Sequence, residues 1–325
     1  MTTKSVSLTY LLSIYLVIPI VLTLVWLDKS FFGSSIMQAL PFIPETWILW
    51  VYVFGLPHLF AGFNMFADKE YLKFYGWKLL IITVVFMALP LVVMNTMGSK
   101  AMFFIFVGFI VYHTISQQFG IAIVAMKQRP AKLFLVWKWS ALGVSAILYV
   151  MLYQQPIPLA LDLFNPYRAW LVNTSSVLII IFAISGFLLM WKSSNKIGAA
   201  HVFANMALIS CEVILFHTGY FLFMVLVGRV VHEMTAWHIY ATHDSNRSAV
   251  GKPNLIIKAL SFTKLPVYVL SIFAAFLIGF IVTYSASLFT LGASLIVSLS
   301  LLHYYSESFL WKNGTIHRHN LSFTH

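Results

Sequence analysis

The sequence is poor in charged residues and has a single cysteine. Of its 325 residues, 9% are Asp, Glu, Lys or Arg, whereas 61% are hydrophobic and the mean hydropathy is +0.89. Soluble domains contain about 25% charged residues, so this composition excludes an ordinary soluble protein. One cysteine, Cys211, cannot form an intrachain disulfide or a four-thiolate zinc site. The composition therefore predicts a polytopic membrane protein whose metal chemistry cannot rest on sulfur.

Several common enzyme signatures are missing as well. His232 and His238 superficially resemble the paired histidines of zinc proteases, but that motif needs a spacing of four residues and these are six apart. The sequence has no histidine pairs of the kind found in membrane desaturases, no Ser-centred nucleophile elbow and no Gly-rich phosphate loop. These absences exclude several classes of hydrolase and nucleotide-binding enzyme.

Long apolar runs are abundant. A membrane-spanning helix needs about 20 apolar residues. Runs of this kind predict an all-α bundle of about ten transmembrane helices, at residues 1–27, 46–66, 77–97, 101–126, 133–153, 169–191, 199–217, 219–243, 266–285 and 287–311. They form one transmembrane domain over residues 1–325, which ends in a polar C-terminal tail at 312–325. Tight links are expected at Thr218–Gly219 and near Ser285–Ala286.

The basic residues test this topology independently. If both termini are cytoplasmic, all but four of the 20 Lys and Arg residues lie on the inside, the exceptions being Lys29, Lys100, Arg168 and Arg229. Such a bias is the positive-inside pattern of membrane proteins. It explains the formal charge of +11 through contact with membrane lipids, so no nucleic-acid partner is expected. The expected location is a bacterial inner (plasma) membrane.

Ionisable residues at membrane depth mark the candidate site. The segment 229–243 lies at the end of an apolar run and contains Arg229, Glu233 and, at membrane depth, the two histidines His232 and His238. Each such group costs about 2.5–3.5 kcal/mol to insert, so it is seldom kept without a partner or a function. This segment is the first candidate for chemistry.

Histidines from several predicted helices lie at a similar depth. Counted from the inner helix ends at about 1.5 Å per residue, five of them fall within about 12 Å of one another. These are His58, His113, His232, His238 and His303. Ligands that converge from facing helices form metal sites in helical bundles, and imidazole suits iron, zinc and copper. The pattern predicts a metal site for iron, zinc or copper.

Helical spacing adds detail to this site. His303 and Glu307 are four residues apart and share a face, as do His113 and Gln117. A carboxylate one turn away can bind the same ion or orient the histidine. His232 and His238 differ by about 120° around a helix, so a kink, a second ion or a single ligand must be invoked. Glu233 and Glu307 are the candidate catalytic carboxylates.

Short motifs resemble one known family. Gly55-Leu56-Pro57-His58 resembles the Gly-Leu-Pro-His segment near the start of the bacteriorhodopsin-related (Brp/Blh-like) β-carotene dioxygenases. His113 in Tyr112-His113-Thr114-Ile115-Ser116, 55 residues later, is similar to that family's second motif. The resemblance implies an iron-dependent membrane enzyme that uses four histidines, here with His232 and His238 as the remaining two, and that cleaves a carotenoid with dioxygen.

The resemblance covers scattered motifs and not the whole chain. This sequence departs from the family in Leu59-Phe60-Ala61-Gly62, in the wide spacing of His232 and His238, and in extra spans at both ends.

The sequence thus favours a membrane-embedded oxygenase with non-haem iron, acting with dioxygen on a lipid-soluble carotenoid, acyl or isoprenoid chain. Three alternatives stay open. A proton-coupled transporter would use Arg229, Glu233, Glu212 and the histidines as a relay. Paired histidines could bind haem. A structural or assembly protein would need none of them for chemistry.

Overall fold

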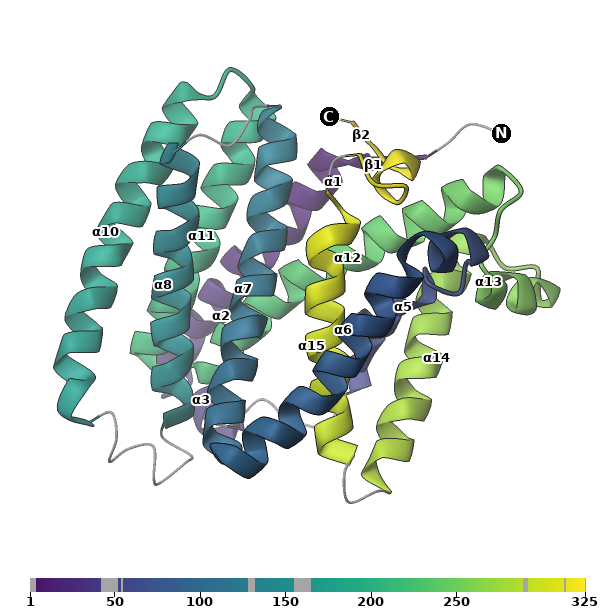
Figure 1. Ribbon diagram of the computed structural model, residues 1–325. Coiled ribbons are helices and arrows are strands. Elements are labelled where there is room, and N and C mark those ends of the chain that lie inside the picture. Colours follow the sequence, from purple (N-terminus) through teal and green to yellow (C-terminus); the bar gives the residue numbers. More distant parts are fainter. Residues whose placement is uncertain are drawn as a thin grey trace. The chain divides into compact units, whose positions relative to one another are not determined.

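A computed structural model describes residues 4–41, 52–53, 55–127, 132–154, 165–288, 292–312 and 314–324. This part of the chain is almost entirely helical, and the prediction of an all-α fold is confirmed (Figure 1). Two short strands are the exception. The beginning of the span predicted at 46–66 lies outside the described residues.

The helices follow one another with short connections. In chain order they are α1 (Leu8–Ser13), η1 (Ile14–Leu16), α2 (Val17–Phe31), α3 (Ser35–Ala39), α5 (Leu56–Asn64), α6 (Lys69–Thr96), α7 (Ser99–Met126), α8 (Lys132–Gln154), η3 (Asn165–Tyr167), α10 (Arg168–Lys192), α11 (Lys196–Thr218), α12 (Phe221–Ala249), α13 (Leu255–Leu260), η4 (Ser261–Thr263), α14 (Val267–Ser287), α15 (Gly292–Leu310) and η5 (Arg318–Asn320). The strands are β1 (Ser5–Ser7) and β2 (Ser322–Thr324).

Among the described residues, 7 helical segments are long and apolar enough to cross a membrane. These are Leu8–Phe31, Lys69–Thr96, Ser99–Met126, Lys132–Tyr153, Arg168–Lys192, Lys196–Thr218 and Val267–Ala286. The chain is therefore a membrane protein by the character of its helices. The predicted total of ten is not established by this count, because α12 and α15, which correspond to two more predicted spans, fall outside it.

Local sequence signals explain where several helices begin and end. The side chains of Asp68, Asn195 and Asn254 accept hydrogen bonds from backbone N–H groups in the first turns of α6, α11 and α13. Gly219 ends α11 in the left-handed conformation at φ +86°, which confirms the predicted tight link after Thr218. The link predicted near Ser285–Ala286 begins slightly later, because α14 continues to Ser287.

The described chain divides into two compact units. The first comprises Met1–Ser7, Ile48–Phe109 and Glu233–Thr324, and the second comprises Leu8–Trp47 and Ile110–His232. Helices α7 and α12 each contribute residues to both units.

In the first unit, α5 packs against α14 and α15, and α15 packs along α6 (Figure 1). Gly279 on α14 allows close contact with α5, since a Cβ there would lie 2.9 Å from the backbone nitrogen of Pro57. The two ends of the chain meet in this unit, because β1 and β2 pair in parallel, with Val6 opposite Phe323.

In the second unit, α8 packs along α10, and α11 packs against both. Its core contains a buried carboxylate, Glu212 on α11, which accepts a 3.1 Å hydrogen bond from Ser145 on α8. Gly228 on α12 makes room for Glu212, since a Cβ there would lie 2.8 Å from the carboxylate oxygen. A polar residue buried in this way needs a partner, and Ser145 supplies one.

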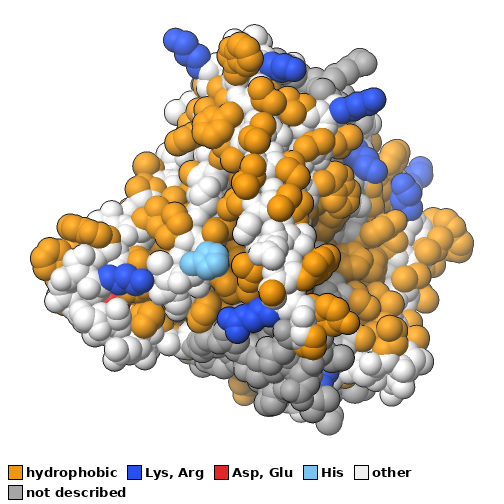
Figure 2. Space-filling model, turned by 90° about the vertical axis from the view of Figure 1, so that its left-hand side faces the viewer, with side chains coloured by type: hydrophobic (Ala, Val, Ile, Leu, Met, Phe, Trp, Pro, Cys, Tyr) orange, Lys and Arg blue, Asp and Glu red, His pale blue; other side chains and the backbone are white. Residues whose placement is uncertain are grey.

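The outer surface is mostly apolar on the face drawn in Figure 2, with few Lys and Arg side chains and almost no acidic ones. Large side chains such as Trp77 and Trp191 are 75% and 83% exposed. Exposed apolar area of this extent is expected where helices face lipid.

Candidate metal centre

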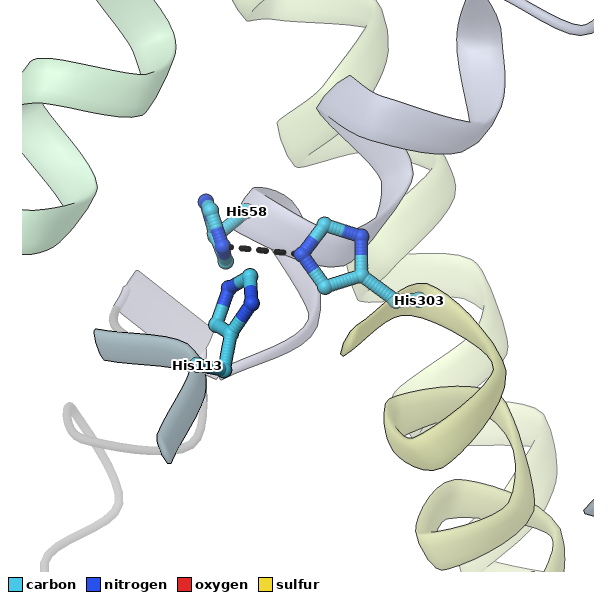
Figure 3. A group of neighbouring side chains, drawn as sticks. All are labelled: His58, His113 and His303. Carbon is cyan, nitrogen blue, oxygen red and sulfur yellow. Dashed lines mark hydrogen bonds between the residues drawn. The ribbon is translucent and has the colours of Figure 1, made fainter. Parts of the chain in front are cut away.

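His58 and His303 face each other inside the first unit. Gly55 precedes α5 as its N-cap and Pro57 lies in the first turn, where a missing N–H costs nothing. This start places His58 toward α15, which bears His303. The Nε2 atoms of the two imidazoles are 3.0 Å apart, and the ring planes are 81° from parallel (Figure 3). Both residues are fully buried.

A glycine makes this contact possible. Gly62 follows His58 by one helical turn, and a Cβ at Gly62 would lie 2.9 Å from both Cε1 and Nδ1 of His303. The hydroxyl of Tyr240 lies 3.3 Å from the same point. The ring of Tyr240 is 6.1 Å from the ring of His58, between centroids. The histidine pair is therefore bordered by one small residue and one buried phenol.

Glu307 lies next to His303, as its position one turn along α15 predicts. Its Oε1 atom is 4.0 Å from Nε2 of His303, and the residue is 7% exposed. At this distance a carboxylate can hold an imidazolium or join a shared cation. The predicted pairing of His303 with Glu307 is confirmed in geometry.

The second unit contains another histidine pair. His113 on α7, which Figure 3 also labels, and His232 on α12 have ring centroids 4.8 Å apart, with planes 81° from parallel. Both are buried. Gln118 on α7 donates a 3.4 Å hydrogen bond to the carbonyl of Val231, which links the same two helices. The sequence pattern predicts Gln117 as the partner of His113, whereas the helix contact is made by Gln118.

The two other predicted site residues lie further along α12, in the part that belongs to the first unit. Glu233 is fully buried. His238 is half-buried and its Nδ1 atom lies 2.9 Å from the hydroxyl of Tyr268 on α14. Because α12 is a continuous helix through both histidines, His232 and His238 point in different directions and have different neighbours. Whether His238 also binds metal stays a prediction.

The spacing of the first pair can be compared with known coordination. Imidazole nitrogens lie about 2.0–2.1 Å from a transition metal, so two ligands at a right angle are about 3.0 Å apart, and two at the tetrahedral angle about 3.4 Å. The observed 3.0 Å suits neighbouring ligands of a six-coordinate ion, and it equally suits one N–H···N hydrogen bond. Axial ligands of a haem would be about 4 Å apart with the porphyrin between them. The pair therefore fits a bare metal ion and does not fit a haem.

Comparison with known proteins gave no further identification. No family model, no curated protein and no solved structure matches the chain.

Tyr240 is the site residue that sequence reasoning missed. It is 1% exposed, and within the described part of the chain its hydroxyl has no hydrogen-bond partner. A signal was present in the sequence, because Glu233 and Tyr240 are seven residues apart and so lie on one helix face.

Proposed function

We propose that this protein is a membrane-embedded, metal-dependent oxygenase. Its metal is non-haem iron, held by His58, His113, His232 and His303. Its substrate is a lipid-soluble carotenoid, acyl or isoprenoid chain. The bundle crosses a bacterial inner membrane ten times with both termini in the cytoplasm, which puts these histidines in the cytoplasmic half.

One observation supports the proposal most directly. Two fully buried imidazoles on α5 and α15 have their Nε2 atoms 3.0 Å apart. Neutral imidazoles at right-angle spacing favour a six-coordinate ion such as iron over tetrahedral zinc. Iron held by several imidazoles with open positions can bind and activate dioxygen.

The protein's own groups have separate tasks in this proposal. Glu307 accepts or returns a proton beside His303. Its buried position keeps that exchange away from bulk water. Apolar residues next to the pair exclude water and favour an apolar substrate; Ala61 and Leu302 are buried, and the ring of Phe63 contacts that of His303 at 5.8 Å.

Metal analysis of the purified protein tests the proposal. Protein in detergent should contain about one iron per chain, because the site has a single set of ligands. His58→Gln and His303→Gln should each lose it, since an amide is a poor replacement for imidazole. The matched control is His319→Gln, because His319 is exposed. Iron, zinc and copper all at trace level in the unmodified protein would refute the metal site.

The role of the second pair is tested separately. If His113 and His232 complete the site, His113→Gln should release the same ion that His303→Gln releases. If His113→Gln retains its full iron content, His113 and His232 are not ligands of this ion, and the site with His58 and His303 must be completed by other groups.

A proton-coupled transporter is the second candidate, and Glu212 favours it. This carboxylate is buried on an apolar helix and bonded to Ser145. Such residues often mark proton paths in membranes. The transporter predicts pH-driven flux in liposomes that Glu212→Gln abolishes and that chelators leave unchanged.

A further inference from the structure

Tyr240 begins a series of aromatic rings in the first unit. From the ring of His58 to that of Tyr240 the centroid distance is 6.1 Å, and from Tyr240 to Trp311 it is 5.8 Å. Trp311 in turn lies 6.0 Å from the ring of His243. Tyrosine and tryptophan are the side chains most easily oxidised by one electron, so neighbouring rings of this kind can pass electrons.

The series ends at a hydrogen-bonded tyrosine. The Tyr71 hydroxyl lies 2.8 Å from Nε2 of His243, and Asn320 donates a 3.0 Å hydrogen bond to the same hydroxyl. Nδ1 of His243 lies 3.3 Å from a carboxylate oxygen of Asp244. Ser271 donates a 2.6 Å bond to the other oxygen of Asp244. Tyr71, His243 and Asp244 are all buried.

Charges around Tyr71 are fixed by ion pairs. The guanidinium of Arg247 lies 4.7 Å above the Tyr71 ring. It is held there by an ion pair with Asp68 and by Glu70 at 3.0 Å. The ring of His317 also stacks on that of Tyr71, with the two ring centroids 3.7 Å apart. A purely structural role of Tyr71 would explain its packing. It would not require the hydrogen-bonded series from the Tyr71 phenol to the His243 imidazole and on to the Asp244 carboxylate.

We propose that Tyr71 is a redox-active tyrosine that supplies an electron to the histidine site through Trp311 and Tyr240, with His243 taking the phenolic proton. This inference rests on the proposed function, because an oxidised metal centre is the physiological electron acceptor. The relay discharges an oxidising centre that has not met its substrate, and it protects the neighbouring side chains.

The step balances in atoms and charge. The O–H bond of Tyr71 breaks, and its proton forms a bond to Nε2 of His243. The electron lowers the oxidation state of the oxidised centre by one. Asp244 stabilises the imidazolium through its hydrogen bond. A one-electron donor of the thiol or ascorbate class then reduces the phenoxyl radical, and the proton returns from His243. Each cycle consumes one electron from that donor.

The first experiment needs no metal. Metal-free protein in detergent is oxidised by photogenerated tris(bipyridine)ruthenium(III), frozen, and analysed by electron paramagnetic resonance. A persistent tyrosyl radical should form, because the phenol with a proton acceptor is the easiest to oxidise. Tyr71→Phe should lose it. His243→Gln should lose it too, although Tyr71 is still present, because an amide does not accept the proton.

Tyr75→Phe is the matched control. Tyr75 is a buried tyrosine one turn from Tyr71 on α6, and its ring also contacts His317, at 5.3 Å. The Tyr75→Phe variant should keep the full radical signal. A persistent signal in Tyr71→Phe, or its loss in Tyr75→Phe alone, would overturn the assignment of Tyr71.

The second experiment tests the path. Iron-loaded protein is treated with hydrogen peroxide, and the same radical is measured. Trp311→Phe should lose the radical here but keep it with the ruthenium oxidant, which reaches Tyr71 without the centre. A radical unaffected by Trp311→Phe would refute the path. If the protein binds no iron, the proposed function fails, whereas the ruthenium result still decides the assignment of Tyr71.

Discussion

At the scale of single residues, Gly62 decides whether the histidine pair can form. Alanine there would place its Cβ 2.9 Å from two atoms of the His303 ring. The ring must then move away from His58, and overpacking of this kind costs about 1–3 kcal/mol. Gly62→Ala should therefore lower both the thermal stability and the bound iron, measured by a melting curve and by element analysis.

Gly76→Ala is the control for this substitution. Gly76 also lies within a helix, α6, and a Cβ there would meet no atom within 4 Å. The metal content of Gly76→Ala should match that of the unmodified protein, and its stability should not fall, because alanine favours a helix by about 0.5–1 kcal/mol over glycine. If Gly62→Ala binds iron as well as Gly76→Ala does, the close contact between α5 and His303 is not needed for the site.

His317 predicts a pH dependence of stability. Burial, and after it the nearby His243 and Arg247, hold the pKa of His317 far below its usual range. The unfolded chain binds a proton here below pH of about 6.5, whereas the folded protein keeps the ring neutral. The neutral, buried ring of His317 therefore makes its full contribution to the free energy of unfolding above that pH, and this contribution is lost as the pH falls below it. Between about pH 7.5 and pH 5 the loss should be about 2 kcal/mol.

Melting curves in detergent at the two pH values measure this effect. His317→Phe keeps a stacking ring but cannot be protonated, so it should remove this part of the pH dependence. His319→Gln, at an exposed position, should leave it unchanged. Equal pH dependence in His317→Phe and the unmodified protein would contradict the prediction.

At the scale of elements, the N-terminal strand depends on one side chain. Asn246 accepts a 2.6 Å bond from the Lys4 N–H and donates bonds of 2.8 and 2.9 Å to the carbonyls of Lys4 and Asn320. Asn246→Ala leaves these groups without that partner, at a cost of about 1–3 kcal/mol each if they stay buried. Proteolysis near Ser5–Ser7 should become faster, as mass spectrometry would show.

Asn95→Ala serves as the comparison for this strand. Asn95 is exposed, and its side chain donates to the carbonyl of Leu91 within its own helix. Cleavage at the N-terminal strand should not change. A similar rate of cleavage in both variants would mean that Asn246 does not hold β1.

Elements also show how far sequence reasoning reaches. The end of α11 at Thr218 and the pairing of His303 with Glu307 follow from local rules, so both could be predicted. The facing of His58 and His303, 245 residues apart, depends on which helices pack together, and periodicity does not encode that. His317 illustrates the same limit. Its polar neighbours in sequence predict a solvated tail, yet Tyr71, 246 residues earlier in the chain, stacks on it, and Trp311, six residues earlier, also contacts it.

At the scale of the whole molecule, the paired termini constrain the number of membrane crossings. β1 precedes the first candidate span and β2 follows α15, and the two strands are hydrogen-bonded in parallel. If this pairing holds in the membrane, both strands lie on one side and the number of crossings between them is even, as in the proposed topology. The 7 candidate spans among the described residues are an odd number. An even number therefore requires a crossing beyond these 7, and the candidates are α12, α15 and the span predicted at 46–66, which begins outside the described residues. The proposed ten crossings satisfy this condition.

Reporter fusions test this topology. A fluorescent protein, which folds in the cytoplasm, and alkaline phosphatase, which is active outside it, can each be attached to either end. Both termini should give fluorescence and no phosphatase activity, because the positive-inside bias predicts that they lie in the cytoplasm. A fusion after Gly219, in the tight turn that follows α11, should give the opposite result. Termini on opposite sides would require an odd number of crossings, and the strand pairing between Ser5–Ser7 and Ser322–Thr324 could not exist in the membrane.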